Sequence, residues 1–126
     1  MANYLKVLLV HTQPEVIQEV KDFLGHAVIQ FAADGADGLF AGRMEEFDLV
    51  VCALDLPLIT GLEVVRALRN MSPNNKTPVI FLGNGTETPQ HLALISRLRG
   101  GYFLREELTA GDFLYEWNTA MAALEI

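Results

Sequence analysis

The sequence predicts a three-layer α/β fold, in which a doubly wound parallel sheet of five strands lies between two layers of helices. Short apolar runs alternate with longer segments of helical periodicity, which is typical of consecutive βαβ units. The run at 47–54 is apolar apart from one aspartate, as a central parallel strand covered on both faces must be. The chain has 126 residues, the length of one ordinary domain.

The first half of the chain begins with a strand at 4–10, a nearly continuous run of β-type residues that ends at HTQP. The next helix begins near Pro14 and ends at Gly25, because proline suits the first turn of a helix and glycine its end. Its apolar face should carry Val16, Val20, Phe23 and Leu24. The second strand is expected over 27–32, and the turn ADGADG then opens a short helix through Met44.

The second half continues the same alternation after the strand at 47–54. A helix begins near Gly61 and should face inward with Leu62, Val65, Ala67 and Leu68. The fourth strand follows a polar loop, and NGTETPQ leads into the next helix. The remaining elements are expected at 78–83 (strand), 89–98 (helix), 100–104 (strand) and 107–124 (amphipathic helix).

Composition limits the classes of protein to which the chain can belong. Hydrophobic residues make up 51% of the sequence, and the formal net charge is −7, so we expect one globular domain over 1–126. Nucleic acid and membrane surfaces are not expected as partners, because both require clustered Lys and Arg. The single cysteine, Cys52, cannot form an internal disulfide. With no apolar run of about 18 residues and no signal peptide, a cytoplasmic location is expected.

In an open α/β sheet, ligands bind outside the carboxyl ends of the strands, where the strand order reverses. Candidate functional residues should therefore follow the strands directly. The sequence places these at His11 and Thr12, at 53–57, at 83–85 and at Arg105.

The whole chain resembles a response-regulator receiver domain. The resemblance is carried by KVLLVHTQPEV, FDLVVCALDLPLITGLEVVRALR, TPVIFLGNG and GGYFLR. It implies a flavodoxin-like (βα)5 fold and a role in bacterial two-component signalling. In that family the phosphoacceptor aspartate lies four residues before a loop proline, and a glycine follows the proline by four. Pro57 and Gly61 match these anchors, so the acceptor position falls on Ala53 and not on Asp55.

The resemblance places the family's other functional positions on unusual residues as well. The two metal-binding acids fall on His11 and Thr12, the switch hydroxyl on Gly83 and the lysine on Arg105, whereas the aromatic switch position is retained as Tyr102. Phosphorylation needs a carboxylate nucleophile and a divalent cation held by oxygen ligands. The resemblance thus implies a pseudo-receiver that is not an enzyme, uses no cofactor and does not bind Mg²⁺.

Asp55 has three interpretations. It is a loop aspartate bonded to nearby backbone N–H groups, or the partner of Arg105 in an ion pair, or an unconventional phosphoacceptor. His11 and Cys52 together suggest a metal or nucleophile site, but Cys52 should point to the opposite face of its strand from Ala53. His11 is expected to be a partly exposed filler of the pocket.

Three functions follow from these residues. The favoured one is a non-phosphorylated, receiver-like interaction module of a two-component or phosphorelay pathway. The alternatives are a phosphorelay regulator modified at Asp55, and a small hydrolase or metal protein that uses the vacated pocket. The expected partner is a protein: a histidine kinase, an effector domain or another signalling protein. A homodimer through the last helix and strand faces is also predicted, and the chain is compatible with being a fragment of a longer protein.

Overall fold

The computed structural model describes residues 5–24, 27–70 and 72–104, and the helix expected over 107–124 lies outside these ranges. The strands are β1 (Leu5–Val10), β2 (Ala27–Ala32), β3 (Leu49–Ala53), β4 (Val79–Gly83) and β5 (Gly100–Leu104). The helices are α1 (Glu15–Leu24), α2 (Gly35–Met44), α3 (Gly61–Asn70) and α4 (Pro89–Arg97). Each lies within two residues of its expected bounds.

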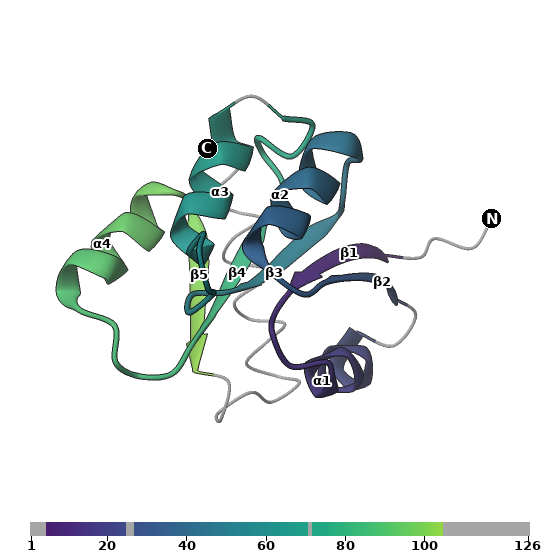
Figure 1. Cartoon of the computed structure of the whole chain (residues 1–126), viewed down its shortest axis with the longest axis horizontal. Coiled ribbons are helices and arrows are strands. Elements are labelled where there is room, and N and C mark those ends of the chain that lie inside the picture. The colour runs from purple at the N-terminus through teal and green to yellow at the C-terminus, as the bar shows by residue number, and fades with distance from the viewer. Residues whose placement is uncertain (1–4, 25–26, 71, 105–126) are drawn as a thin grey trace.

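All described strand pairs are parallel, and the sheet order is β2-β1-β3-β4-β5. This arrangement confirms the predicted fold class. The chain moves outward from β1 to β2, returns to β3 on the other side of β1, and then continues outward through β4 and β5 (Figure 1). The order therefore reverses between β1 and β3, so their carboxyl ends are the favoured place for a site.

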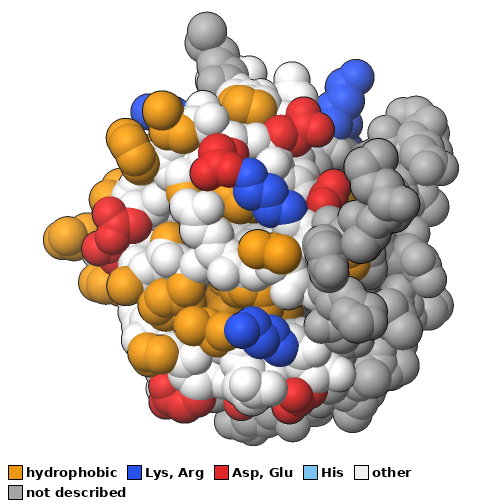
Figure 2. All heavy atoms as spheres, turned by 90° about the vertical axis from the view of Figure 1, so that its right-hand side faces the viewer, with side chains coloured by type: hydrophobic (Ala, Val, Ile, Leu, Met, Phe, Trp, Pro, Cys, Tyr) orange, Lys and Arg blue, Asp and Glu red, His pale blue; other side chains and the backbone are white. Residues whose placement is uncertain are grey.

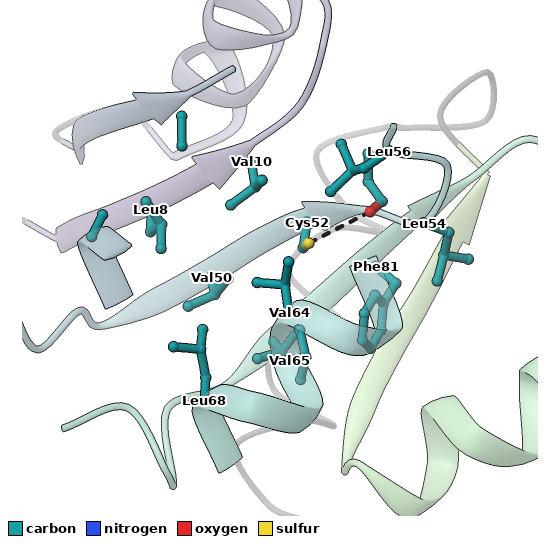
Figure 3. Packing of buried hydrophobic residues seen from close by; sticks show 14 of the residues in the cluster. Leu8, Val10, Val50, Cys52, Leu54, Leu56, Val64, Val65, Leu68 and Phe81 are labelled. Atoms are coloured by element: carbon teal, nitrogen blue, oxygen red, sulfur yellow. Dashed lines mark hydrogen bonds between the residues drawn. The ribbon is translucent and has the colours of Figure 1, made fainter. Parts of the chain in front are cut away.

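The core consists of two apolar layers, one on each face of the sheet. On one face, Val16 and Val20 of α1 pack against a layer that includes Leu49 and Val51 of β3. On the other face, α2 and α3 cover a cluster that includes Val50 and Cys52 (Figure 3). Because β3 supplies alternate side chains to both layers and is buried at every position, it is the central strand that the sequence predicted.

Helix α3 buries a slightly different face from the expected one. Gly61, Val64, Val65 and Leu68 are buried, whereas Leu62 and Ala67 are only partly so. The buried set follows the i, i+3, i+4, i+7 spacing of a helical stripe. Val64 was therefore missed, Val65 and Leu68 are buried as predicted, and Leu62 and Ala67 lie at the margin of the buried face.

Small residues bring α2 close to its neighbours. A Cβ on Gly38 would lie 2.7 Å from Cγ2 of Val10, and a Cβ on Gly42 would lie 2.5 Å from Cδ2 of Leu68. Since real Cβ atoms do not approach other atoms so closely, these two glycines set the distance from α2 to β1 and to α3. Among the described helices, none has the length and apolar character needed to cross a membrane.

Candidate functional site

A pocket of about 250 Å³ opens at the carboxyl ends of the central strands. It brings together five of the residues that the sequence singled out: His11, Thr12, Ala53, Asp55 and Gly83. Its other lining residues are Gln13, Leu82, Asn84 and Leu104. The pocket thus lies where ligands are expected in an open α/β sheet, outside the carboxyl ends of the strands; we call this expectation the strand-end rule. Arg105 lies outside the described residues, so its ion pair with Asp55 remains a prediction.

His11 is held firmly at the end of β1. Its backbone N–H donates to the carbonyl oxygen of Ala32 at 3.1 Å, and its Nδ1 accepts from the backbone N–H of Gln13 at 3.0 Å. The residue is 8% exposed, so the expectation of a partly exposed side chain is wrong. The reason is that His11 follows β1 directly and its backbone N–H still bonds to Ala32 of β2, which holds it against the edge of the sheet.

Ala53 and Asp55 lie in different environments although they are two residues apart. Ala53 ends β3 and is buried, whereas Asp55 is exposed on the loop that leads to α3. Gly61 closes this loop tightly, because a Cβ there would lie 2.0 Å from the carbonyl oxygen of Ala53. At the acceptor position implied by the resemblance, the pocket therefore has a methyl group, and its lining has a single carboxylate.

Cys52 does not contribute a nucleophile to this pocket. It is fully buried in the cluster beneath α2 and α3, and burial raises the pKa of its thiol to about 12. Its sulfur lies 3.5 Å from the carbonyl oxygen of Ala53, the contact dashed in Figure 3. Because thiols react as thiolates, a buried Cys52 with a raised pKa is inert. Among the residues that the structure describes, no group of three or more His, Cys, Asp and Glu is placed to hold a metal ion.

A second pocket, of about 330 Å³, adjoins the first and shares Asp55 and Asn84 with it. Its remaining lining residues are Leu54, Thr60, Leu62, Thr86, Glu87 and His91. His91 is engaged in a capping box with Thr88 at the start of α4. Glu87 is the acidic residue of this pocket that joins the β4–α4 loop to β5.

Glu87 accepts hydrogen bonds from three groups. The Tyr102 hydroxyl donates to its Oε2 at 2.5 Å, the backbone N–H of Gly85 donates to Oε2 at 3.0 Å, and that of Asn84 donates to Oε1 at 3.2 Å. Burial alone would raise the pKa of the Glu87 carboxyl, but the hydrogen bond from Tyr102 and those from the backbone outweigh it and hold the pKa below its usual value.

Gly83 makes this arrangement sterically possible. A Cβ at position 83 would lie 2.5 Å from Cε2 of Tyr102 and 2.7 Å from Oε1 of Glu87. The Tyr102 ring therefore occupies space that any side chain at position 83 would need. Gly83 and Tyr102 were both singled out from the sequence, but the contact between them was not foreseen.

Sequence reasoning missed Glu87 altogether. It follows β4 at the same sheet edge as Gly83 and Asn84, so the strand-end rule would have found it if the search had extended two residues beyond Gly85. No periodicity or spacing in the sequence indicates its pairing with Tyr102, which is 15 residues away.

The order of the sheet, the helices on its two faces and the pocket at the reversal point are those of a receiver domain. Residues 7–103 match the model of the response regulator receiver domain family, and the chain belongs to this family. It is therefore a receiver-type signalling module of two-component systems, a class that is typically non-catalytic and interacts with histidine kinases and other signalling proteins.

Similar proteins support this family. The chain is 34% identical, over 71 residues, to the CAI-1 autoinducer sensor kinase/phosphatase CqsS of Vibrio cholerae. The match covers 56% of this chain but only 10% of that relative's length. Among solved structures, the chemotaxis protein CheY4 of Vibrio cholerae is similar, with 25% identity, a TM-score of 0.76, and coverage of 90% of this chain and 95% of that one. A CheY-like receiver domain from Methanospirillum hungatei shares the fold, with a TM-score of 0.80 at 15% identity over 98% of both chains.

Proposed function

We propose that this chain is a pseudo-receiver, which takes part in signalling through protein contacts without being phosphorylated. The observation that carries this proposal is Ala53. The resemblance puts the phosphoacceptor at this position, and the side chain there is a buried methyl group at the pocket lining. A methyl group has no lone pair with which to attack a phosphoryl group.

The pocket also offers poor ligands for Mg²⁺. This ion prefers carboxylate and other hard oxygen ligands in octahedral geometry. Where the family has two acids, this chain has the imidazole of His11 and the hydroxyl of Thr12, and Asp55 supplies the single carboxylate of the lining. The residues present do not fit a magnesium site, so no step of the proposed function uses the metal.

The contact between Tyr102 and Glu87 supports a module with one fixed conformation. In place of a hydroxyl-bearing switch residue, Gly83 leaves room for the Tyr102 ring, and the carboxylate of Glu87 holds its hydroxyl. The partner should therefore recognise a surface near α4 and β5 that does not depend on phosphorylation. A histidine kinase, an effector domain or another signalling protein fits this role, and the cytoplasmic location remains a prediction from the sequence.

One observation favours an alternative. Asp55 is exposed and lines both pockets, so it is accessible to a phosphodonor although it is two residues away from the expected position. A hydrolase or metal protein finds no such support among the described residues, because Cys52 is buried.

The test is incubation with acetyl phosphate and Mg²⁺, followed by intact mass spectrometry. We expect no stable adduct on the native chain, and none on Ala53→Asp, because His11 and Thr12 still provide no carboxylates. Asp55→Asn is the matched control, since it removes the other candidate acceptor. A stoichiometric gain of one phosphoryl group on the native chain that Asp55→Asn abolishes would overturn the proposal in favour of the alternative.

A further inference from the structure

The loop that follows β4 contains an asparagine directly before a glycine, Asn84 and Gly85. Both residues are exposed, and Asn84 lines both pockets. The side-chain amide of an asparagine is open to attack by the backbone nitrogen of the residue that follows it. Glycine permits this attack best, because it has no Cβ to obstruct the approach and its backbone adapts most easily. The pair therefore has the chemistry needed for spontaneous deamidation.

The side chain of Asn84 is held with its carbonyl oxygen against Thr86. Its Oδ1 accepts from the backbone N–H of Thr86 at 3.1 Å and from the Thr86 hydroxyl at 2.6 Å. Because both donors lie two residues further along the chain, the side chain folds back along the peptide bond that joins Asn84 to Gly85. Two donors on one carbonyl oxygen stabilise the negative charge that develops there when a nucleophile adds to Cγ.

The attacking nitrogen, that of Gly85, has a proton acceptor within reach. Its N–H donates to Oε2 of Glu87 at 3.0 Å, and a general base must lie within hydrogen-bond distance of the proton that it removes. Gly85 has a φ of +89°, and beyond its chain neighbours a Cβ placed there would meet only Cδ2 of Leu104, at 3.5 Å. The surroundings of this residue are thus open enough for its backbone to move toward Cγ of Asn84.

We propose that Asn84 is a self-modification site, which the folded loop converts to aspartate or isoaspartate. The nitrogen of Gly85 forms a bond to Cγ of Asn84 and gives its proton to the carboxylate of Glu87. The bond from Cγ to Nδ2 then breaks, and Nδ2 leaves as ammonia with the proton that Glu87 returns. Water opens the resulting succinimide ring at either of its two carbonyl carbons. One water is consumed and one ammonia is released, with no oxidation or reduction.

The product changes the charge of the pocket lining. Asp55 is the single carboxylate of the first pocket, and conversion of Asn84 adds a second one, which also lines the second pocket. The isoaspartate form lengthens the backbone by one methylene group between the two N–H groups that Glu87 accepts from. The modification requires neither a phosphodonor nor Mg²⁺, so it stands independently of the proposed pseudo-receiver.

The test is incubation of the native chain at mildly alkaline pH in water enriched in a heavy oxygen isotope, followed by peptide mapping that separates aspartate from isoaspartate. We expect Asn84 to convert several-fold faster in the folded chain than in a synthetic peptide of residues 82–88, with one heavy oxygen incorporated. Asn75 is the internal reference, because it is exposed but is followed by Lys76, and it should stay intact over the same time.

The protein concentration is kept low during the incubation. Figure 2 shows that the β2 side of the molecule exposes gathered hydrophobic side chains, and such a surface promotes association at high concentration. The rate then reports on the single chain.

Three variants test the roles of the neighbouring side chains. Thr86→Val removes the hydroxyl donor and should slow the conversion several-fold, whereas Thr86→Ser retains the donor and is the matched control. Glu87→Gln removes the proton acceptor and should slow the conversion as well. Tyr102→Phe is its control, because it removes one hydrogen bond to Glu87 but leaves the carboxylate beside Gly85, and it should leave the rate unchanged.

Circular dichroism of each variant checks that the fold is retained. An Asn84 that converts no faster in the folded chain than in the peptide overturns the proposal. So does a rate that either Thr86→Val or Glu87→Gln leaves unchanged or raises.

Discussion

The two ends of the sheet are built differently. At the end where the strands begin, buried polar side chains are bonded to several backbone segments at once. At the end where they finish, a pocket remains open and Asp55, Asn84 and Thr86 are exposed. The comparison suggests that stability is concentrated at the first end, which leaves the second end free to change its chemistry without loss of the fold.

Asn74 illustrates the first end. It is 1% exposed, and its amide group makes four hydrogen bonds. The Oδ1 atom accepts from the Phe47 backbone N–H and the Thr77 hydroxyl, and Nδ2 donates to the carbonyl oxygens of Gly42 and Glu45. One side chain thus ties the end of α2, the segment before β3 and the segment before β4.

Arg69 extends this network to a fourth segment, the one that follows α4. Its Nε donates to the carbonyl oxygen of Leu98 at 2.9 Å, and its Nη1 donates to that of Thr77 at 2.6 Å. Burial, and then the positive charge of Arg99, lower the pKa of Arg69 to about 10. The guanidinium is still charged at neutral pH, so its bonds to carbonyl oxygens remain charge-assisted.

The largest effect is expected for Asn74→Ala. This substitution leaves several buried backbone groups without a partner, so it should lower the free energy of unfolding by about 2 to 4 kcal/mol. Urea denaturation measures the loss. Asn75→Ala is the matched control, because Asn75 is exposed, and it should be nearly neutral. Equal losses in the two variants would show that the network does not anchor this end.

An intermediate effect is expected for Gly83→Ala, at the end of the sheet where the strands finish and the pocket opens. The added methyl group would collide with Tyr102 and Glu87, so one of these side chains must move, at a cost of about 1 to 3 kcal/mol. The same substitution in a Tyr102→Ala background should cost clearly less, because the ring that it would meet is gone. An equal cost in both backgrounds would contradict the steric account.

The smallest effect is expected for Glu87→Gln. At neutral pH the variant should lose about 0.5 to 1.5 kcal/mol, because it weakens the charge-assisted bonds to Tyr102 and the backbone. Glu87 has a lowered pKa in the folded state, so its contribution is present above its ordinary pKa of 4.5 and is lost as the pH falls through the lowered value.

The pH dependence provides the check on Glu87. In urea denaturation, the difference between the native chain and Glu87→Gln should shrink as the pH falls below about 4.5. Tyr102→Phe should show part of the same loss at neutral pH, since it removes one of the three donors. A difference that stays constant down to pH values well below this range would contradict the assignment.

The sequence was most informative where periodicity and spacing decide the structure. The strand at 27–32 and the start of α3 at Gly61 were predicted with their observed bounds, because apolar runs and a loop glycine mark them directly. The pocket was predicted because parallel strands end at a common edge.

Contacts between distant segments were not predictable. The bond from Tyr102 to Glu87 and the four bonds of Asn74 join residues whose side chains carry no periodic signal. In the sequence, Asn74 is one polar residue within a polar loop, and it becomes a buried anchor only because the fold brings this loop against the end of α2 and the segment before β3. His11 was expected to be partly exposed for the same reason, since its bond to Ala32 depends on where β2 ends.

The most direct test of the proposed pseudo-receiver is whether the pocket at the carboxyl ends of the strands responds to a phosphodonor at all. Two-dimensional NMR of the ¹⁵N-labelled chain follows the backbone amides of Asn84, Gly85 and Tyr102 while acetyl phosphate and Mg²⁺ are added, with NaCl at matched ionic strength as the reference. A fixed pseudo-receiver predicts no difference between the two titrations at these amides. A saturable shift with the phosphodonor and Mg²⁺ that Asp55→Asn abolishes would contradict the account.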